Sequence, residues 1–323
     1  MKEIKISENE SEQRLDRFLR KLLKNIPLKE IYKYIRKGIV KVNGKKVKEN
    51  YMLQLNDIVT LYIENIEFEK TYKRSFEEIN IVYEDDNILI LDKPVGLLCH
   101  PESSKDKDTL VQRVLGHVVK SNTTEQSLTF SPALCNRLDR NTSGLIIAAK
   151  NYDALKSVNE MIREKGLIKY YLCIVKGSTK DKGEINIIIG KDQEKRMAYL
   201  ADSKKFCGKK AKTRYIKLAD NGDYSLLKVE LATGRFHQIR AHLSGINHPI
   251  IGDTKYGDNE INDFFSKKYS LKYQFLIAYS LYFKNPLKSL EYLKGKTWHS
   301  DIPKDFAIII KSLFGDLKDI VDL

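Results

Sequence analysis

Between residues 81 and 231 the chain carries six short apolar runs, each bounded by turn residues. Such runs are typical of β-strands, and stretches with helical periodicity do not alternate with them regularly. This order excludes a doubly wound parallel fold and favours an α+β domain built on a large mixed sheet. The predicted strands are 81–83, 88–91, 145–149, 170–175, 185–189 and 226–231. The predicted helices are 109–119, 152–165, 235–244 and 303–314.

The first 63 residues show a different pattern, that of a small basic α+β module. They hold 15 Lys and Arg against 8 Asp and Glu. The resulting net charge of +7 is half of the chain's +14. Apolar residues at 15, 18, 19, 22 and 23 follow the spacing of an amphipathic helix. A second helix is predicted before Gly38, and Asn43-Gly44 is typical of a two-residue hairpin turn. The predicted elements are helices at 14–23 and 28–36 and strands at 39–42, 45–48 and 57–63.

These patterns divide the chain into a basic module over 1–63, a linker over 64–76 and a main domain over 77–323. The linker (ENIEFEKTYKRSF) is mostly polar and charged, and a loop within one domain is the alternative interpretation. Residues 258–272 are predicted to form a surface insertion. The chain shows no internal repeat.

The positive charge favours a polyanionic partner, either a nucleic acid or an anionic membrane surface. No apolar run reaches the roughly 18 residues that a membrane span needs. The first residues also lack the apolar core of a secretory signal. We therefore expect a cytoplasmic protein without a membrane-embedded segment.

Metal binding and disulfide bonding are not expected from the Cys and His pattern. The four cysteines are separated by 36, 38 and 34 residues, and none belongs to a CxxC pair or a Cys/His cluster. His237, His242 and His248 lie five and six residues apart, which is not the i, i+4 spacing of two ligands on one helical face.

The segment 136–150 is the most informative for chemistry. Asp139 stands between two arginines and shortly before an apolar strand. Nearby guanidinium groups favour the ionised form of a carboxylate. An ionised and fixed carboxylate can act as a nucleophile or as an electrostatic stabiliser at an anomeric carbon. The competing interpretation is a solvated loop of charges before a strand.

Two further segments combine turn residues with side chains suited to ligand binding. Residues 91–101 (LDKPVGLLCHP) run from an apolar strand into a loop that ends in His-Pro. In residues 230–243 a strand ends at Thr233-Gly234 and a helix is predicted to follow. A helix start with arginines is a good anchor for phosphate or carboxylate groups. The polar side chains in its first turns are Arg235, His237, Gln238 and Arg240.

In this order the three segments resemble the motifs of the RluA-type family of RNA pseudouridine synthases. Residues 91–101 resemble the family's L-D-K-P-x-G-L-x-x-H-P, 136–144 its H-R-L-D-x-x-T-S-G, and 233–243 its T-G-R-x-H-Q-I-R-x-H-L. Residues 169–172 are similar to its K-x-Y-L. Two positions depart from the pattern, because Asn136 replaces the first His of H-R-L-D and Asn285 the His of a late F-x-H-P.

The resemblance implies that the protein isomerises uridine in RNA to pseudouridine without a cofactor or a metal. Asp139 is then the nucleophile or charge stabiliser and Arg240 its ion-pair partner. Tyr171 is expected to pack on the uracil and can serve as general base at C5. Attack at C1′, attack at C6 and a glycal route all remain open. Arg137 is expected to fill the space left by a flipped-out uridine. Substrate binding is implied for Thr142, Gly234, Arg235, His237 and Gln238.

The basic module resembles an S4 domain, a small RNA-binding fold. The similarity rests on Arg14-Leu15-Asp16, on residues 35–45 and on Asp57. Contacts with RNA phosphates are therefore implied for its exposed basic residues. These are Arg36, Lys37, Lys41, Lys45 and Lys46.

An S4 domain ahead of such a catalytic domain is typical of family members that modify large-subunit ribosomal RNA. Residues 32–59 are most similar to the RluC branch, which acts on 23S rRNA. We expect 23S rRNA or a large-subunit precursor as partner, and a monomeric enzyme.

One alternative is the same chemistry on tRNA. A non-catalytic RNA-binding protein should have lost Asp139 or Arg240, and a membrane-surface protein would need an exposed apolar face on the helix at 14–23.

Overall fold

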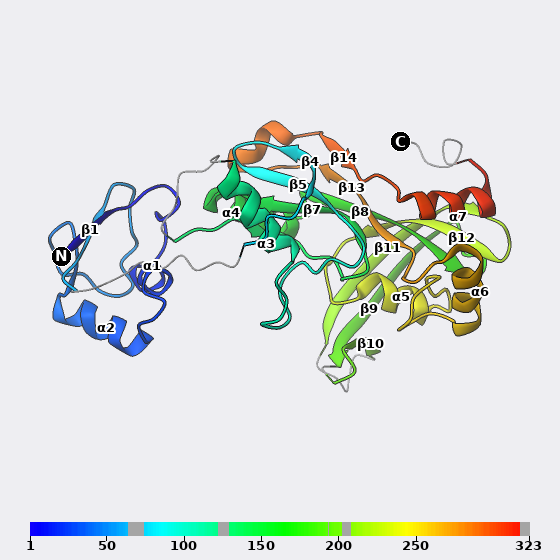
Figure 1. Ribbon diagram of the computed structural model, residues 1–323, viewed down its shortest axis with the longest axis horizontal. Helices are drawn as coiled ribbons and strands as arrows, with labels where there is room; N and C mark the ends of the chain where they lie inside the picture. The colour runs from blue at the N-terminus through cyan, green and yellow to red at the C-terminus, as the bar shows by residue number, and fades with distance from the viewer. Residues whose placement is uncertain (64–73, 122–128, 193, 202–207, 317–323) are drawn as a thin grey trace.

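The computed structural model of the chain consists of a small module at the N-terminal end and a larger α+β domain built on one long sheet (Figure 1). This confirms the predicted fold class. Cys207 and most of the predicted linker lie outside the described residues. Those residues are 1–63, 74–121, 129–192, 194–201 and 208–316.

The N-terminal module packs two helices against a three-stranded antiparallel sheet with the order β1-β3-β2. Both predicted helices are present, and their apolar stripes form the core of the module. Leu15, Phe18 and Ile31 are fully buried there. The second helix ends at Gly38, whose φ of 71° is left-handed. The elements are β1 (Lys2–Lys5), α1 (Leu15–Leu22), α2 (Leu28–Lys37), β2 (Val40–Val42) and β3 (Ile58–Leu61).

The predicted hairpin of this module is confirmed at its turn but not in its second strand. Asn43 and Gly44 have φ of 51° and 73°, as a two-residue hairpin turn requires. After the turn only Lys45 pairs back, with Val42, and the chain then leaves the sheet. The prediction of a strand over 45–48 is therefore wrong. The third strand of the sheet is β1, whose short and mostly charged sequence gave no strand pattern.

The main sheet has the order β10-β9-β11-β12-β8-β13-β7-β5-β4, with β14 paired to β13 and β6 to β7. Among the described strands, β13 and β7 are the only parallel neighbours. The strands are β4 (Asn80–Glu84), β5 (Ile88–Lys93), β6 (Ala133–Leu134), β7 (Ser143–Ala149), β8 (Leu167–Lys176), β9 (Lys182–Asp192), β10 (Met197–Ala201), β11 (Lys209–Asp220), β12 (Tyr224–Leu231), β13 (Leu276–Phe283) and β14 (Thr297–His299).

The four predicted helices of the main domain are present, and one of them begins later than predicted. The helix predicted from residue 235 begins at Gln238, because His237 has a left-handed φ of 51°. The predicted surface insertion contains a helix whose Phe265 is fully buried in the main core. The helices are α3 (Leu110–Lys120), α4 (Tyr152–Arg163), α5 (Gln238–Gly245), α6 (Asn259–Tyr269), the 3-10 helix η1 (Lys288–Leu293) and α7 (Lys304–Phe314).

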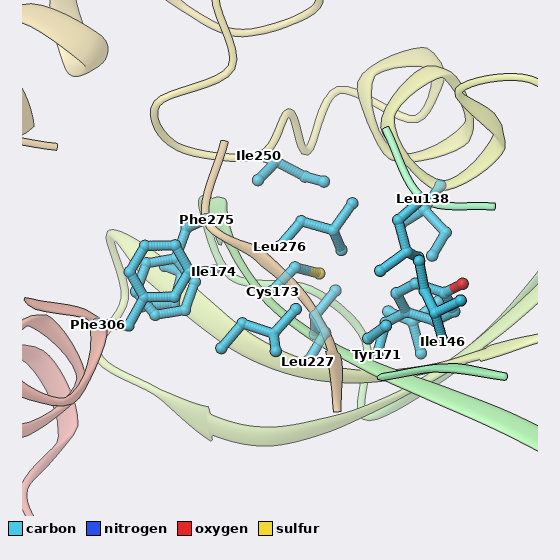
Figure 2. Packing of buried hydrophobic residues seen from close by; sticks show 14 of the residues in the cluster. Leu138, Ile146, Tyr171, Cys173, Ile174, Leu227, Ile250, Phe275, Leu276 and Phe306 are labelled. Atoms are coloured by element: carbon cyan, nitrogen blue, oxygen red, sulfur yellow. The ribbon is translucent and has the colours of Figure 1, made fainter. Parts of the chain in front are cut away.

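The two faces of the sheet at β5 and β7 pack against different helices. Ile146 and Ala148 of β7 belong to the large core cluster that contains residues of α3, α5 and α7, whereas the alternate residues of β7 pack with α4. All of β7 is buried for this reason. Figure 2 shows the large cluster, in which Phe275 and Phe306 stack with ring centroids 3.9 Å apart.

Contacts at α4 join the N-terminal module to the main domain. Asn9 Oδ1 accepts a hydrogen bond from the backbone N–H of Tyr152 at 3.0 Å. Lys156 Nζ lies 2.7 Å from Glu12 Oε2. Ser75, at the end of the predicted linker, is buried and donates its backbone N–H to the carbonyl of Gln112 on α3.

The parallel junction between β13 and β7 depends on a glycine. The registered pairs are Ile277 with Ser143 and Ala278 with Gly144. A Cβ on Gly144 would lie 2.3 Å from the carbonyl oxygen of Ala278, and φ at this glycine is +107°. Close backbone approach and a positive φ both require glycine here.

Gly144→Ala is expected to lower the free energy of unfolding by about 3 kcal/mol or more, because the added methyl collides with backbone and the φ becomes strained. Gly222→Ala is the matched control, since Gly222 has a φ of +91° but no atom within 4 Å of the added Cβ. It should lose only the strain, about 1 kcal/mol. Urea unfolding measures both variants, and equal losses would contradict the role of the strand junction.

Candidate active site

Asp139 lies in the turn that leads into β7, and buried polar groups hold this turn. The backbone N–H of Thr142 donates to the carbonyl of Asp139 at 3.1 Å. Thr142 is itself buried, and its Oγ1 accepts from Gln274 Nε2 at 3.2 Å. The side chain of Asp139 retains 26% of its exposure, so a ligand can reach it.

The loop that follows β5 is tied to the Asp139 turn by reciprocal bonds. Gly96 donates its N–H to the carbonyl of Arg140 at 2.9 Å, and Arg140 Nε donates to the carbonyl of Gly96 at 3.0 Å. Cys99 Sγ lies 3.2 Å from the carbonyl of Leu138 and 3.3 Å from its N–H. The first two segments singled out from the sequence therefore form one unit.

Lys93 cross-links the same two loops from inside the protein. Its side chain is fully buried, and Nζ donates to the carbonyls of Pro94, Leu97 and Arg140 at 2.8, 2.9 and 3.0 Å. Burial lowers the pKa of Lys93 to about 8. Three carbonyl acceptors compensate the loss of water around the ammonium group.

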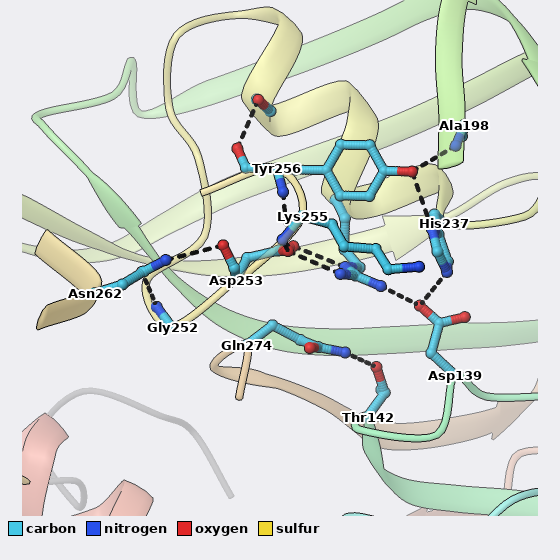
Figure 3. A network of polar contacts seen from close by, with 12 residues as sticks. Asp139, Thr142, Ala198, His237, Gly252, Asp253, Lys255, Tyr256, Asn262 and Gln274 are labelled. Atoms are coloured by element: carbon cyan, nitrogen blue, oxygen red, sulfur yellow. Dashed lines mark hydrogen bonds and ion pairs between the residues drawn. The ribbon is translucent and has the colours of Figure 1, made fainter. Parts of the chain in front are cut away.

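Arg240 on α5 contacts both Asp253 and Asp139, the two carboxylates labelled in Figure 3. Its Nε and Nη2 donate to the two carboxylate oxygens of Asp253, each at 2.7 Å, and both side chains are buried. Asp253 Oδ1 also accepts the backbone N–H groups of Lys255 and Tyr256. The remaining Nη1 donates to Asp139 Oδ2 at 3.1 Å. The guanidinium is therefore oriented before any substrate arrives.

His237 approaches the same oxygen of Asp139 from just before α5. Its Nε2 lies 3.7 Å from Asp139 Oδ2, and its Nδ1 lies 2.9 Å from the hydroxyl of Tyr256. The imidazole stacks on Phe236 with ring centroids 3.7 Å apart. Burial lowers the pKa of His237 to about 4, and the charge of Arg240 contributes, so the ring is neutral near pH 7.

Tyr171 is buried on β8 in the core cluster that also contains Leu138, the residue before Asp139 (Figure 2). Burial raises the pKa of the Tyr171 hydroxyl, and the nearby Asp139 and Cys99 add to this effect. The phenol therefore stays neutral at physiological pH. Arg137, which precedes Leu138 in the chain, is exposed.

Gln238 organises the start of α5 through its buried amide. Its Oε1 accepts from Thr233 Oγ1 at 2.7 Å and from the backbone N–H of Arg235 at 3.0 Å. Its Nε2 donates to the carbonyl of Lys212 and to Thr213 Oγ1 on β11. The backbone amide of Arg235 is therefore bound by Gln238.

Gly234 and Arg235 are both exposed, and Arg235 Nε donates to the carbonyl of Lys210 at 3.2 Å. The prediction that Arg235 and His237 lie in the first turns of the helix is wrong. Both precede the helix, because the left-handed conformation of His237 delays its start.

The structure brings together Asp139, His237 and Arg240, but it does not bring the basic residues of the N-terminal module to them (Figure 1). Arg36, Lys37, Lys45 and Lys46 are exposed. A Cβ added at Gly38 would lie 3.7 Å from Lys46 Cδ, so the hairpin turn lies beside the end of α2. Lys41 is half-buried, with Nζ 5.3 Å from the ring centroid of Tyr62.

Both departures from the family motifs have backbone partners. Asn136 Oδ1 accepts the N–H of Ile147 on β7 at 3.0 Å. Asn285 donates its backbone N–H to the carbonyl of Gly166 at 3.0 Å. Asn136 therefore stabilises the strand that follows the Asp139 turn.

Sequence reasoning gave no role to Asp253 or Tyr256, although both contact the site residues. Asp253 is the anion that fixes Arg240, and Tyr256 contacts His237. The available signal for the ion pair was that Asp253 is an acidic residue 13 positions after Arg240. Nothing in the spacing showed that the chain after α5 folds back onto that helix.

Within the described residues, no group of three or more His, Cys, Asp or Glu is arranged to hold a metal ion. Over the same residues, no helix is both long and apolar enough to cross a membrane.

Asp253→Asn is expected to lower the free energy of unfolding by about 3–5 kcal/mol, because it leaves the buried guanidinium of Arg240 without its anion. Asp258→Asn is the matched control. It removes a surface ion pair with Lys176 but keeps an N-cap for α6, so stability should be nearly unchanged. Urea unfolding compares the two, and similar losses would contradict the importance of the buried pair.

Two family models match the chain. The RNA pseudouridylate synthase model matches residues 87–245, and the S4 domain model matches residues 13–59. The first match contains Asp139, Tyr171 and Arg240.

Curated relatives match nearly the whole chain. The uncharacterized RNA pseudouridine synthase YlyB of Bacillus subtilis is 31% identical over 96% of this chain and 97% of its own length. Ribosomal large subunit pseudouridine synthase C of Vibrio cholerae is 33% identical over 88% of this chain and 89% of its own.

Among solved structures, Human RNA Pseudouridylate Synthase Domain Containing 4 shares the fold. Its TM-score is 0.57 at 24% identity, over 72% of this chain and 92% of that one. The length and identity of the curated matches show that the chain belongs to the RNA pseudouridine synthase family, as an enzyme with an S4 domain ahead of its catalytic domain.

Proposed function

We propose that the enzyme isomerises uridines of 23S rRNA and that Asp139 is its catalytic carboxylate. The reaction breaks the N1–C1′ bond, turns the uracil and forms a C5–C1′ bond, and only the C5 proton leaves. It therefore needs a fixed carboxylate, a partner for its charge, a proton acceptor and a pocket that retains the detached base.

The contact between Asp139 and Arg240 carries this proposal. Arg240 Nη1 lies 3.1 Å from Asp139 Oδ2, and Asp253 holds the guanidinium from behind. A charge-assisted hydrogen bond from a fixed donor holds the carboxylate in one orientation. The partial exposure of Asp139 leaves it open to a nucleotide.

Tyr171 fits the role of a ring that packs on the uracil, because it is buried beside the turn of Asp139. Burial raises the pKa of its hydroxyl, so a role as general base at C5 would start from the neutral phenol oxygen.

The target uridine must leave its stack, which costs a few kcal/mol. Arg137 is exposed two residues before Asp139, and a guanidinium plane stacks well on bases. We infer that Arg137 fills the vacated space. Arg235 and Gly234 are exposed in the loop before α5 and suit contacts with the RNA backbone, whereas Thr142 and Gln238 act by shaping the loops.

The choice of 23S rRNA rests on the S4 domain and on relatives named ribosomal large subunit pseudouridine synthase C. In that domain the hairpin turn with its exposed lysines lies beside the basic end of α2. Basic side chains gathered in this way suit phosphate contacts without base readout.

Wild-type enzyme is expected to release tritium from 23S rRNA labelled with [5-³H]uridine, and Asp139→Asn to lose at least about a thousandfold in rate, or ~4 kcal/mol of transition-state stabilisation. Asp263→Asn, an exposed carboxylate on α6, should keep the wild-type rate. Release from tRNA but not from 23S rRNA would contradict the proposal that 23S rRNA is the substrate. Unchanged release by Asp139→Asn would overturn the catalytic role.

Charge reversal of Lys45 and Lys46 is expected to weaken RNA binding and to flatten the slope of log K against log salt by about 1.4 to 1.8, the value for two phosphate contacts. Reversal of the exposed Lys304 and Lys311 on α7, at the other end of the molecule (Figure 1), should leave the slope unchanged. Titrations at several salt concentrations measure both. An unchanged slope in the first variant would exclude the hairpin turn from the interface.

A further inference from the structure

The ring of His237 is held by two aromatic neighbours, Phe236 and Tyr256. Phe236 stacks on one face at 3.7 Å and an interplanar angle of 21°, and the ring of Tyr256 stands edge-on at 5.6 Å and 88°. The Tyr256 hydroxyl contacts Nδ1 at 2.9 Å, which leaves Nε2 to face Asp139 (Figure 3). The left-handed backbone at His237 directs the side chain into this position.

The surroundings of the ring determine which nitrogen carries the proton. The backbone N–H of Ala198 can only donate, so it occupies a lone pair of the Tyr256 oxygen. The Tyr256 hydroxyl hydrogen is then available to Nδ1, which accepts it. Nε2 must carry the proton, because an unprotonated Nε2 would turn its lone pair toward the carboxylate of Asp139.

We propose that Tyr256 holds His237 as the Nε2–H tautomer, and that His237 is a positioning residue that donates to Oδ2 of Asp139 and leaves Oδ1 for the uridine. The proposal rests on the catalytic role of Asp139 proposed above. Arg240 donates to the same Oδ2 at 3.1 Å, so closure of the His237 contact would give this oxygen two donors from different directions and restrict rotation of the carboxylate.

The distance of 3.7 Å is longer than a hydrogen bond. Such contacts tighten in catalytic complexes, when water leaves and charge on the carboxylate is confined. Burial lowers the pKa of His237 to about 4, so the donor is neutral. A neutral donor orients the carboxylate without adding a second cation that would weaken its nucleophilicity.

The tautomer can be measured directly by nitrogen NMR of the full-length protein with ¹⁵N-labelled histidine at neutral pH. His237 is expected to show an unprotonated Nδ1 and a protonated Nε2. His248 is the internal reference for the opposite tautomer, because its Nδ1 faces the carbonyl of Lys176 at 2.8 Å and must donate. Tyr256→Phe should shift His237 toward a mixture of tautomers, whereas Tyr269→Phe, which loses a contact with Ser312, should not.

Kinetics test the positioning role. His237→Gly suits the left-handed backbone and opens a space beside Phe236. Its single-turnover rate on RNA is expected to fall about 100-fold, while the Kd for RNA stays within about twofold. Imidazole should restore the rate because it carries both an acceptor and an N–H. 1-Methylimidazole should not, because it lacks the N–H.

Each result decides the matter. A protonated Nδ1 in His237 would overturn the tautomer, and equal rescue by both imidazoles would overturn donation to Asp139. A rise in Kd as large as the fall in rate would make His237 a substrate contact instead. If Asp139→Asn is inactive while His237→Gly is unaffected, this inference fails alone. If Asp139→Asn is fully active, the proposed function fails, whatever the tautomer.

Discussion

The buried ion pair between Arg240 and Asp253 is the interaction on which the active site depends. A guanidinium taken out of water needs a fixed anion, and Asp253 offers both carboxylate oxygens at 2.7 Å. Because two nitrogens of Arg240 are held in this way, the side chain stays in one rotamer and its third nitrogen points at Asp139. The position of the proposed catalytic carboxylate is therefore set by a residue 114 positions later in the chain, through α5.

The sheet supplies the second constraint, because it brings the loops around Asp139 together. Gly144 allows β7 to approach β13 closely, and Lys93 ties the loop after β5 to the turn before β7. Both residues act through backbone atoms rather than side-chain chemistry. The Asp139 turn therefore leads into a strand that is packed on both faces, because alternate residues of β7 contact different helices.

Much of the secondary structure followed from local patterns. Helices α1, α2 and α4 showed amphipathic spacing, and Gly38 marked the end of α2. Strands β11 and β13 were missed for opposite reasons. β11 carries basic residues at 209, 210, 212, 214 and 217 and so contains no apolar run. β13 is apolar or aromatic apart from Ser280, and periodicity does not separate such a run from a buried helix. The start of α5 was misplaced because a left-handed His237 leaves no mark in the sequence.

By itself the sequence determined the family, since the motifs around Asp139, Tyr171 and Arg240 resemble those of RNA pseudouridine synthases and the basic N-terminal module resembles an S4 domain. The order and spacing of the motifs suffice for that resemblance. Only the tertiary structure decided which anion orients Arg240 and which oxygen of Asp139 faces its donors. Those contacts join residues that are far apart in the chain, and their geometry follows from how the sheet and α5 pack, which no local pattern encodes.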